Sequence, residues 1–205
     1  MNFNNTSIDW YQVHEVISAA DRIMLSTHEN PDGDGLGAEC GLYYHLKEIG
    51  KDVRIINYSP LPEYYTFLNS DQIFECYDQN FHENWIKDVD LVIIFDVGDF
   101  VRTRTIVDAI KSHGLKTLNI DHHPHPDEHP FTHNVVDLSA AATGCMVYDY
   151  LQIARTDPIP KKSFEGIYTA VMTDTGCFRY SNTDKKCYEI AIQCVESGVE
   201  THTIY

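Results

Sequence analysis

The sequence predicts an α/β fold, a three-layer domain in which helices flank a mainly parallel sheet. Segments with helical spacing alternate along the chain with short apolar runs, and the connections between them are short. The run at residues 90–95 (DLVIIF) is apolar without alternation, which is typical of a strand covered on both faces. Parallel strands joined by helices account for both observations.

The individual elements follow from the same patterns. Strands are expected at residues 22–27, 53–57, 72–76, 90–95 and 115–120, with a short edge strand at Val135–Val136. Helices are expected at residues 8–20, 35–49, 103–113, 140–154, 161–172 and 185–197, with a short helix near 63–68. Gly50 and Gly114 directly follow two of these helices, a typical place for a helix to end. Residues 60–88 are otherwise mixed in character.

The composition limits the classes of partner. Of the 205 residues, 43% are hydrophobic and 22% are charged, which is ordinary for a globular protein and argues against disorder. There are 15 Lys and Arg against 31 Asp and Glu, so the formal net charge is −16. This charge excludes a basic sleeve for long nucleic acid or duplex DNA. It is compatible with a short phosphate-bearing substrate held by a metal ion, because the ion then supplies the positive charge.

The sequence indicates no membrane partner. No apolar run approaches the ~20 residues of a membrane span, and residues 1–10 lack the basic and apolar regions of a signal peptide. We therefore expect a cytoplasmic protein. Six cysteines, at positions 40, 76, 145, 177, 187 and 194, form no C-x-x-C pair, so we expect reduced thiols that mostly fill the core.

Acidic and histidine residues cluster where the predicted strands end. His28, Asp32 and Asp34 follow the strand at 22–27, and Asp96 follows the strand at 90–95. The sequence Asp121-His122-His123 follows the strand at 115–120, and Asp174 follows the apolar stretch 167–172. Because ligands of parallel sheets bind at the carboxyl ends of the strands, we expect all four segments to meet at one edge.

Converging carboxylates repel one another unless a cation neutralises them. Asp32, Asp34, Asp96 and Asp174 carry about −4 when ionised, and two divalent ions carry about +4. Oxygen and imidazole donors without thiolate suit manganese, magnesium, iron or zinc at a hydrolytic site. Paired ions ~3.5–4 Å apart are a standard arrangement for phosphoryl hydrolysis. Asp96, alone after the central strand, is the natural residue to bridge them and is therefore a candidate catalytic residue.

Other interpretations of these residues exist. Pro31-Asp32-Gly33 alone could be a turn, and His122-His123 alone could be a surface pair; their joint placement favours the metal site. Gly33, Gly35 and Gly37 suggest a dinucleotide-binding loop, but the spacing is not G-x-G-x-x-G and the interleaved aspartates would repel a pyrophosphate. We expect three further histidines to be solvated loop residues rather than accessory ligands: His125, His129 and His133.

Four motifs in this order resemble those of the DHH phosphoesterase superfamily: H-x-N-P-D-x-D at 28–34, Asp96, D-H-H at 121–123 and T-D-T-G at 173–176. Residues 139–143 are similar to the family's turn and helix start. Residues 176–183 resemble the branch of bacterial oligoribonucleases (nanoRNases) that also act as 3′-phosphoadenosine 5′-phosphate phosphatases. The resemblance implies a five-stranded, mainly parallel sheet.

The resemblance also implies roles for individual residues. Two divalent metal ions are implied, with manganese first among the candidates. One ion would be held by His28, Asp32 and Asp96, and the other by Asp34, Asp96, His122 and Asp174. Asp121 would orient a histidine from behind, and His123 would face the substrate phosphate as a catalytic residue. Arg102, Arg104 and Arg179 are our candidates for substrate phosphate contacts, beside the simpler interpretation of solvated surface arginines.

By the resemblance, residues 1–198 form the DHH catalytic domain, and residues 199–205 begin the connection to a C-terminal substrate-binding domain that this sequence lacks. The expected function is that of a dimetal phosphoesterase acting on short oligoribonucleotides or on 3′-phosphoadenosine 5′-phosphate. A manganese-dependent inorganic pyrophosphatase or exopolyphosphatase is the alternative within enzymes. A metal- or nucleotide-binding module without turnover is the alternative of another class. A homodimer is one assembly to be expected.

Overall fold

The computed structural model describes residues 8–126 and 128–204, and one sheet of six parallel strands forms its centre. The strand order is β3-β2-β1-β4-β5-β6. The strands are β1 (Arg22–Ser26), β2 (Asp52–Asn57), β3 (Phe74–Cys76), β4 (Leu91–Phe95), β5 (Thr117–Asp121) and β6 (His133–Val136). The predicted α/β class is confirmed. The sheet has six strands rather than the five that the family resemblance implied, because the short segments predicted at 72–76 and 135–136 both pair at its edges, β3 with β2 and β6 with β5.

The described residues form the helices α1 (Trp10–Ser18), α2 (Gly33–Glu48), α3 (Gln79–Ile86), α4 (Thr105–His113), α5 (Thr143–Ala154), α6 (Lys161–Asp174) and α7 (Lys185–Glu196). Short 3-10 segments lie at Glu63–Asn69, Phe100–Thr103 and Thr201–Thr203. Gly50 and Gly114 follow the ends of α2 and α4 in left-handed conformation, as predicted. Helix α3 was not predicted, because only His82 and Ile86 of its eight residues are buried and the apolar signal is weak.

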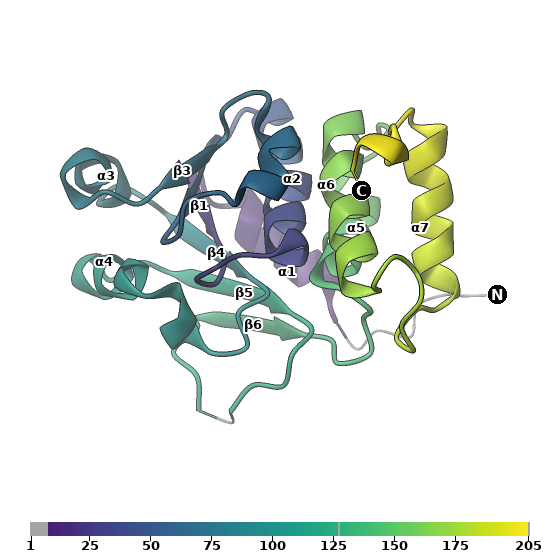
Figure 1. Cartoon of the computed structure of the whole chain (residues 1–205). Coiled ribbons are helices and arrows are strands. Elements are labelled where there is room, and N and C mark those ends of the chain that lie inside the picture. Colours follow the sequence, from purple (N-terminus) through teal and green to yellow (C-terminus); the bar gives the residue numbers. More distant parts are fainter. Residues whose placement is uncertain (1–7, 127, 205) are drawn as a thin grey trace.

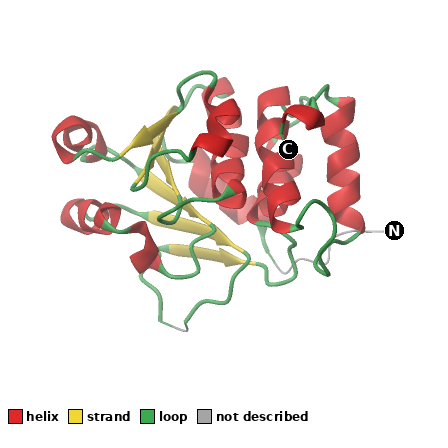
Figure 2. Cartoon of the chain, viewed as in Figure 1, coloured by secondary structure: helices red, strands yellow, loops and turns green. Residues whose placement is uncertain are grey.

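The helices cover both faces of the sheet, as Figures 1 and 2 show. Successive residues of a strand point to opposite faces, so each central strand feeds two separate cores. Ile23 and Ile93 belong to the core beneath α1, α2, α5, α6 and α7, whereas Met24 and Val92 belong to the core beneath α3 and α4. The layers are therefore helix, sheet and helix, with α6 and α7 lying beyond α2 and α5 (Figure 1).

Helices α2 and α6 are in contact along their length because small residues line their interface. A Cβ atom built on Gly37 would lie 2.4 Å from the carbonyl oxygen of Gly166, and one built on Gly33 would lie 2.1 Å from Oγ1 of Thr173. These contacts place the first turn of α2 beside the last turn of α6. The glycines that suggested a dinucleotide loop thus allow close helix packing.

Six cysteines are unpaired, as predicted, and four of them are buried: Cys40, Cys145, Cys187 and Cys194. Within the described ranges, no helix has both the length and the apolar content needed to cross a membrane.

Candidate metal centre

The candidate site lies at the carboxyl ends of β1, β4 and β5. The chain leaves β1 toward β2 and β3 and then returns to form β4 on the other side of β1, so the strand order reverses at this point. Ligands of open α/β sheets bind at such a reversal. His28 and Asp32 follow β1, Asp96 follows β4, and His122 and His123 follow β5.

Asp174 reaches the site in a different way from the one expected. The apolar stretch 167–172 lies in α6, which confirms the helix predicted at 161–172, and Asp174 is the last residue of that helix. Grouping this segment with those that follow strands was therefore wrong. Close packing of α6 on α2 nevertheless carries Asp174 to the same place.

The first group consists of His28, Asp32 and Asp96. His28 Nε2 lies 3.8 Å from an Asp32 carboxylate oxygen and 3.6 Å from Oδ2 of Asp96. His28 Nδ1 lies 2.7 Å from the carbonyl oxygen of Glu29, so an N–H donated there leaves Nε2 free as a ligand. Asp32 also begins α2, since its Oδ1 accepts the backbone N–H of Asp34 at 3.0 Å.

The second group consists of Asp34, His122 and Asp174. His122 Nε2 lies 3.2 Å from Asp174 Oδ2 and 3.5 Å from Asp34 Oδ2. His122 Nδ1 lies 3.1 Å from the carbonyl oxygen of Ala140, which again leaves Nε2 directed at the carboxylates. The fully buried Asp34 accepts the N–H groups of Thr143 and Gly144 at 2.6 and 2.9 Å, at the start of α5. The sequence did not indicate these two hydrogen bonds to Asp34, although free N–H groups at the start of a helix commonly bind anions.

Asp96 lies between the two groups. Its Oδ2 faces His28, and its Oδ1 lies 3.6 Å from His122 Nε2 and 3.2 Å from His123 Nδ1. Its backbone is left-handed, with φ of 55°, a conformation that is uncommon for residues other than glycine but that aspartate adopts more readily than most. This conformation turns the carboxylate of Asp96 into the space shared by both groups.

Asp121, the last residue of β5, is not a candidate ligand but contacts two histidines, His123 and His125. Its carboxylate lies 2.9 Å from His123 Nδ1 and 2.8 Å from His125 Nε2, and it accepts the N–H groups of Val97 and Gly98. His125 was expected to be solvated, but only 5% of its side chain is exposed, because it packs between Asp121 and Phe131. His133 is likewise not a loop residue, since it begins β6, whereas His129 is exposed as predicted.

The predicted arginines differ in their contacts. Arg102 is exposed, and its Nη2 lies 3.1 Å from His28 Nδ1, at the margin of the site. Arg104 forms a two-bonded ion pair with the Glu29 carboxylate, an interaction that the sequence did not indicate. Arg179 is exposed, and its Nε donates to the carbonyl oxygen of Gly176 at 2.9 Å. Of the three, Arg102 therefore has the contact nearest to the candidate ligands.

The residues present suit divalent cations. Among the described residues, the buried side-chain atoms without a hydrogen bond of good geometry include His122 Nε2 and Asp96 Oδ1, which lie 3.6 Å apart. Buried polar atoms are nearly always partnered, so two such atoms facing each other indicate a missing ligand. Three overlapping sets of ligand atoms lie close enough to hold an ion: His28, Asp32, Asp96; Asp34, His122, Asp174; and Asp96, His122, His123.

The pKa values of the candidate ligands are shifted by burial and by the charges of the neighbouring ligands. Burial, together with the charges of Asp96 and Asp174, raises the pKa of Asp34 well above its usual value. Burial likewise raises the pKa of Asp174 to about 6. Burial alone would lower the pKa of His28 and His122, but hydrogen bonds and charges of the surrounding carboxylates raise these values to about 10 and about 9. The metal-free cluster therefore retains protons that cations would displace.

Without metal, we expect the free energy of unfolding to decrease from a pH of about 6.5, the pKa of these histidines in the unfolded state, through about 9 and about 10, the folded pKa values of His122 and His28. In this range the folded state binds more protons than the unfolded state, and the stability that these protons confer is lost as the pH passes the folded values. Melting curves in chelator at several pH values test this. Mn²⁺ should raise the melting temperature more at the higher pH, because it binds neutral imidazole. A chelated protein that melts higher at pH 9 contradicts the prediction.

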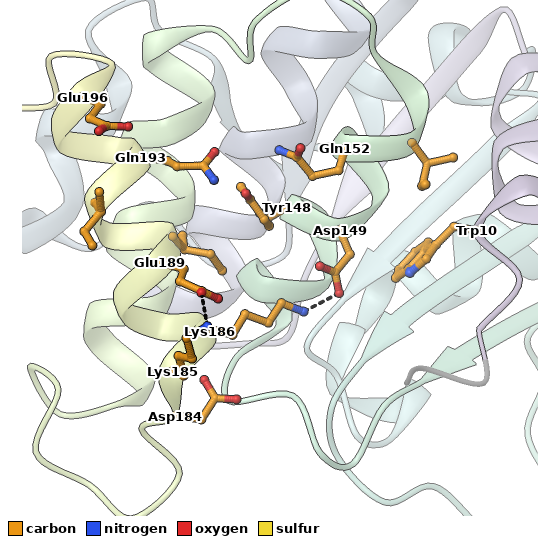
Figure 3. A pocket seen from close by; sticks show the side chains of 13 residues that line it. Trp10, Tyr148, Asp149, Gln152, Asp184, Lys185, Lys186, Glu189, Gln193 and Glu196 are labelled. Atoms are coloured by element: carbon orange, nitrogen blue, oxygen red, sulfur yellow. Dashed lines mark hydrogen bonds and ion pairs between the residues drawn. The ribbon is translucent and has the colours of Figure 1, made fainter. Parts of the chain in front are cut away.

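A second concave region lies elsewhere, in a groove of about 750 Å³ between α5 and α7 (Figure 3). Trp10 closes one side of it, and Lys186 forms an ion pair with Asp149 across it. None of the candidate metal ligands lines this groove. Its lysines and carboxylates are paired in part with one another, so it lacks the converging donors of the sheet edge.

Comparison with known proteins agrees with this geometry. The chain is 30% identical over 189 residues to the bifunctional oligoribonuclease and PAP phosphatase NrnA of Thermus thermophilus, covering 92% of this chain and 54% of that protein. It is also 30% identical over 184 residues to the protein of the same name from Bacillus subtilis, with 88% and 54% coverage. The chain therefore spans about half the length of these curated relatives.

Solved structures give the same result for the fold. The crystal structure of an exopolyphosphatase-related protein from Bacteroides fragilis superposes with a TM-score of 0.90 at 25% identity, covering 100% of this chain and 61% of that one. The family model for the N-terminal domain of the DHH family matches residues 22–173, a range that contains five of the six candidate ligands and all but the final residue of α6, Asp174. On this match and on the four motifs brought together at one sheet edge, the chain belongs to the DHH family.

Proposed function

We propose that this chain is the catalytic domain of a metal-dependent phosphoesterase that hydrolyses short oligoribonucleotides, 3′-phosphoadenosine 5′-phosphate, or both. The observation that carries the proposal is the position of Asp96 between two groups of histidine and aspartate ligands. The names of the Thermus thermophilus and Bacillus subtilis relatives support the choice of substrates. The domain boundary near residue 198 and a homodimeric assembly stay predictions.

In this proposal His28, Asp32 and Asp96 hold one divalent ion, and Asp34, Asp96, His122 and Asp174 hold the second. Bound ions supply Lewis acidity to a phosphoryl oxygen and lower the pKa of a nearby water. We infer Mn²⁺ as the physiological ion from the mixed oxygen and imidazole donors. The rings of His28 and His122 are oriented by hydrogen bonds from their Nδ1 atoms to the carbonyl oxygens of Glu29 and Ala140.

His123 is the proposed proton donor to the phosphate. Its side chain is 45% exposed, and its Nδ1 is held by Asp121 and Asp96, so Nε2 is available to a substrate. The hydrogen bond to the Asp121 carboxylate, followed by the close contact with the Asp96 carboxylate, raises the pKa of His123 to about 10, which keeps the ring protonated at neutral pH. A protonated ring donates a hydrogen bond to charge that develops on phosphoryl oxygens. The exposed guanidinium of Arg102, 3.1 Å from His28 Nδ1, is placed to make a second contact with the substrate phosphate.

Replacing His123 by asparagine is expected to lower kcat about 10²-fold, because general acid catalysis contributes at least this much. Binding of Mn²⁺ should change little, since the ring is not among the proposed ligands. The measurement is steady-state kinetics beside Mn²⁺ titration of the same preparations. A variant that loses Mn²⁺ binding together with activity would place His123 among the ligands instead.

The charge of the protein favours short substrates. A net charge of −16 repels a long polyanion, whereas a dinucleotide places its charge mainly at the cations. Duplex DNA is therefore not expected as a substrate.

The experiment that tests the proposal compares hydrolysis of a 5′-phosphorylated diadenylate, 3′-phosphoadenosine 5′-phosphate, pyrophosphate and polyphosphate in the presence of Mn²⁺. Cleavage of either of the first two supports the proposal. Turnover of pyrophosphate or polyphosphate alone supports the alternative of a pyrophosphatase or exopolyphosphatase, which the name of the Bacteroides fragilis structure favours. Binding of Mn²⁺ without turnover of any of the four supports a binding module.

A further inference from the structure

Asn182, in the loop between α6 and α7, connects two parts of the metal centre that are far apart in the sequence. Its Nδ2 lies 3.0 Å from the carbonyl oxygen of Asp174 and 3.0 Å from that of Ala141. Both partners can only accept hydrogen bonds, so the NH2 group of the amide must face them. One side chain thus joins the end of α6 to the turn that precedes α5.

That turn supports two candidate ligands directly. The carbonyl oxygen of Ala140 lies 3.1 Å from His122 Nδ1, and the N–H groups of Thr143 and Gly144 hold the Asp34 carboxylate. Asp174 is linked to the same turn through its own backbone carbonyl oxygen, which accepts the hydrogen bond from Asn182. The three members of one ligand set, Asp34, His122 and Asp174, therefore all depend on the two segments that Asn182 links.

The other ligand set is supported by different residues. The hydroxyl of Thr27 donates to the carbonyl oxygen of Phe95 at 2.8 Å, which joins the residue before His28 to the residue before Asp96. The amide oxygen of Asn57 accepts the N–H of Thr27 at 3.0 Å. None of these contacts passes through Asn182.

We propose that Asn182 is a positioning residue that sets the distance of Asp174 from His122 and Asp34, and so sets the affinity of one of the two metal positions. The inference rests on the two-ion site of the proposed function. Asn182 is not one of the proposed ligands; its amide holds the end of α6, where carbonyl groups lack partners inside the helix.

The loop keeps its shape by contacts that do not involve the Asn182 amide. Gly176, Cys177 and Phe178 are all left-handed, with φ of 54°, 59° and 62°. Left-handed backbone is unfavourable for residues other than glycine, so surrounding contacts must impose this conformation. Phe178 packs against Tyr168 and Tyr188, and the N–H groups of residues 179 and 180 donate to the carbonyl oxygen of Thr175. Since Asn182 is itself exposed, its substitution leaves the core intact.

The test is titration of metal-free protein with Mn²⁺, by calorimetry and by the electron paramagnetic resonance signal of free Mn²⁺. Wild type should bind two ions. Asn182→Ala and the similarly sized Asn182→Leu should each weaken one binding step about tenfold, the lower end of the effect of supporting residues behind metal ligands, and leave the other unchanged. The matched control is Asn80→Ala on α3, across the sheet, which should bind as wild type does.

The outcomes separate this inference from the proposed function. If wild type binds two ions and both Asn182 variants bind them equally well, the role of Asn182 is overturned and the two-ion site stands. The same conclusion follows if both steps weaken equally with a lower melting temperature of the metal-free variants, because that is a general loss of structure. If wild type binds no Mn²⁺, the two-ion site is overturned together with the inference.

Discussion

Replacing Asp96 by asparagine is expected to remove Mn²⁺ binding at both positions and to lower phosphoester hydrolysis by about 10³-fold or more, the upper range for loss of one group that stabilises a developing charge. Asp96 is the residue whose two oxygens face both ligand groups, His28 on one side and His122 on the other. An amide carries no charge and has a single acceptor oxygen, so it cannot bridge two cations.

Asparagine is the substitution that preserves the backbone at this position. The φ of 55° at Asp96 is a conformation that asparagine adopts more readily than other residues with a side chain. The variant should therefore fold, and its circular dichroism should match that of wild type. Asp157→Asn, the same chemical change at an exposed loop position, is the control and should keep both binding and activity. An Asp96→Asn protein that still binds two Mn²⁺ ions contradicts the bridging role.

Replacing Gly37 by alanine is expected to lower the free energy of unfolding by about 2–3 kcal/mol, the upper range for overpacking. The added methyl group would lie 2.4 Å from the carbonyl oxygen of Gly166 and 2.8 Å from the backbone nitrogen of Ala170. Backbone atoms of a packed helix cannot rotate away, so α6 must shift as a whole. Because α6 ends in Asp174, the same change should also weaken Mn²⁺ binding.

Gly41→Ala on the same helix is the matched control. There the nearest atom to an added methyl group is a side-chain carbon of Ile167 at 3.1 Å, which can adjust. Alanine is also favoured over glycine in a helix by about 1 kcal/mol, which offsets the remaining crowding. Chemical denaturation of both variants measures the difference. Equal losses for the two variants, or no loss for Gly37→Ala, would show that α2 and α6 are less tightly packed than the structure indicates.

Local patterns predicted most of the fold and several parts of the site. The run at 90–95 is apolar enough to predict a central strand, and the sheet topology then fixes Asp96 beside His28. The apolar run at 167–172 is ambiguous in the same terms, because a short buried run fits a strand or a buried helix equally well. The helix predicted at 161–172 is confirmed, so Asp174 comes to the sheet edge from a helix end, although it was grouped with residues that follow strands.

Other features depend on contacts between distant segments and leave little trace in the sequence. Burial of His125 requires Asp121 and Phe131 on its two sides, and nothing in the spacing of the histidines indicates this. The support of His122 by the carbonyl oxygen of Ala140 is a backbone contact, which any residue type could make. The edge strand predicted at 135–136 is confirmed, but the sequence did not indicate that it begins at His133, because the four residues of β6 are all only partly buried.

The strand order has a consequence for how the protein is made. Ligands drawn from His28 to Asp174 meet only when β4 has inserted next to β1 and α6 has docked on α2. A nascent chain that has not yet released residue 174 from the ribosome therefore lacks the complete second ligand set. Pairing of segments so far apart is a slow event in folding. In the proposed two-ion site, the ion of the second ligand set is therefore acquired only after α6 has been synthesised and has docked, and its uptake would report that step.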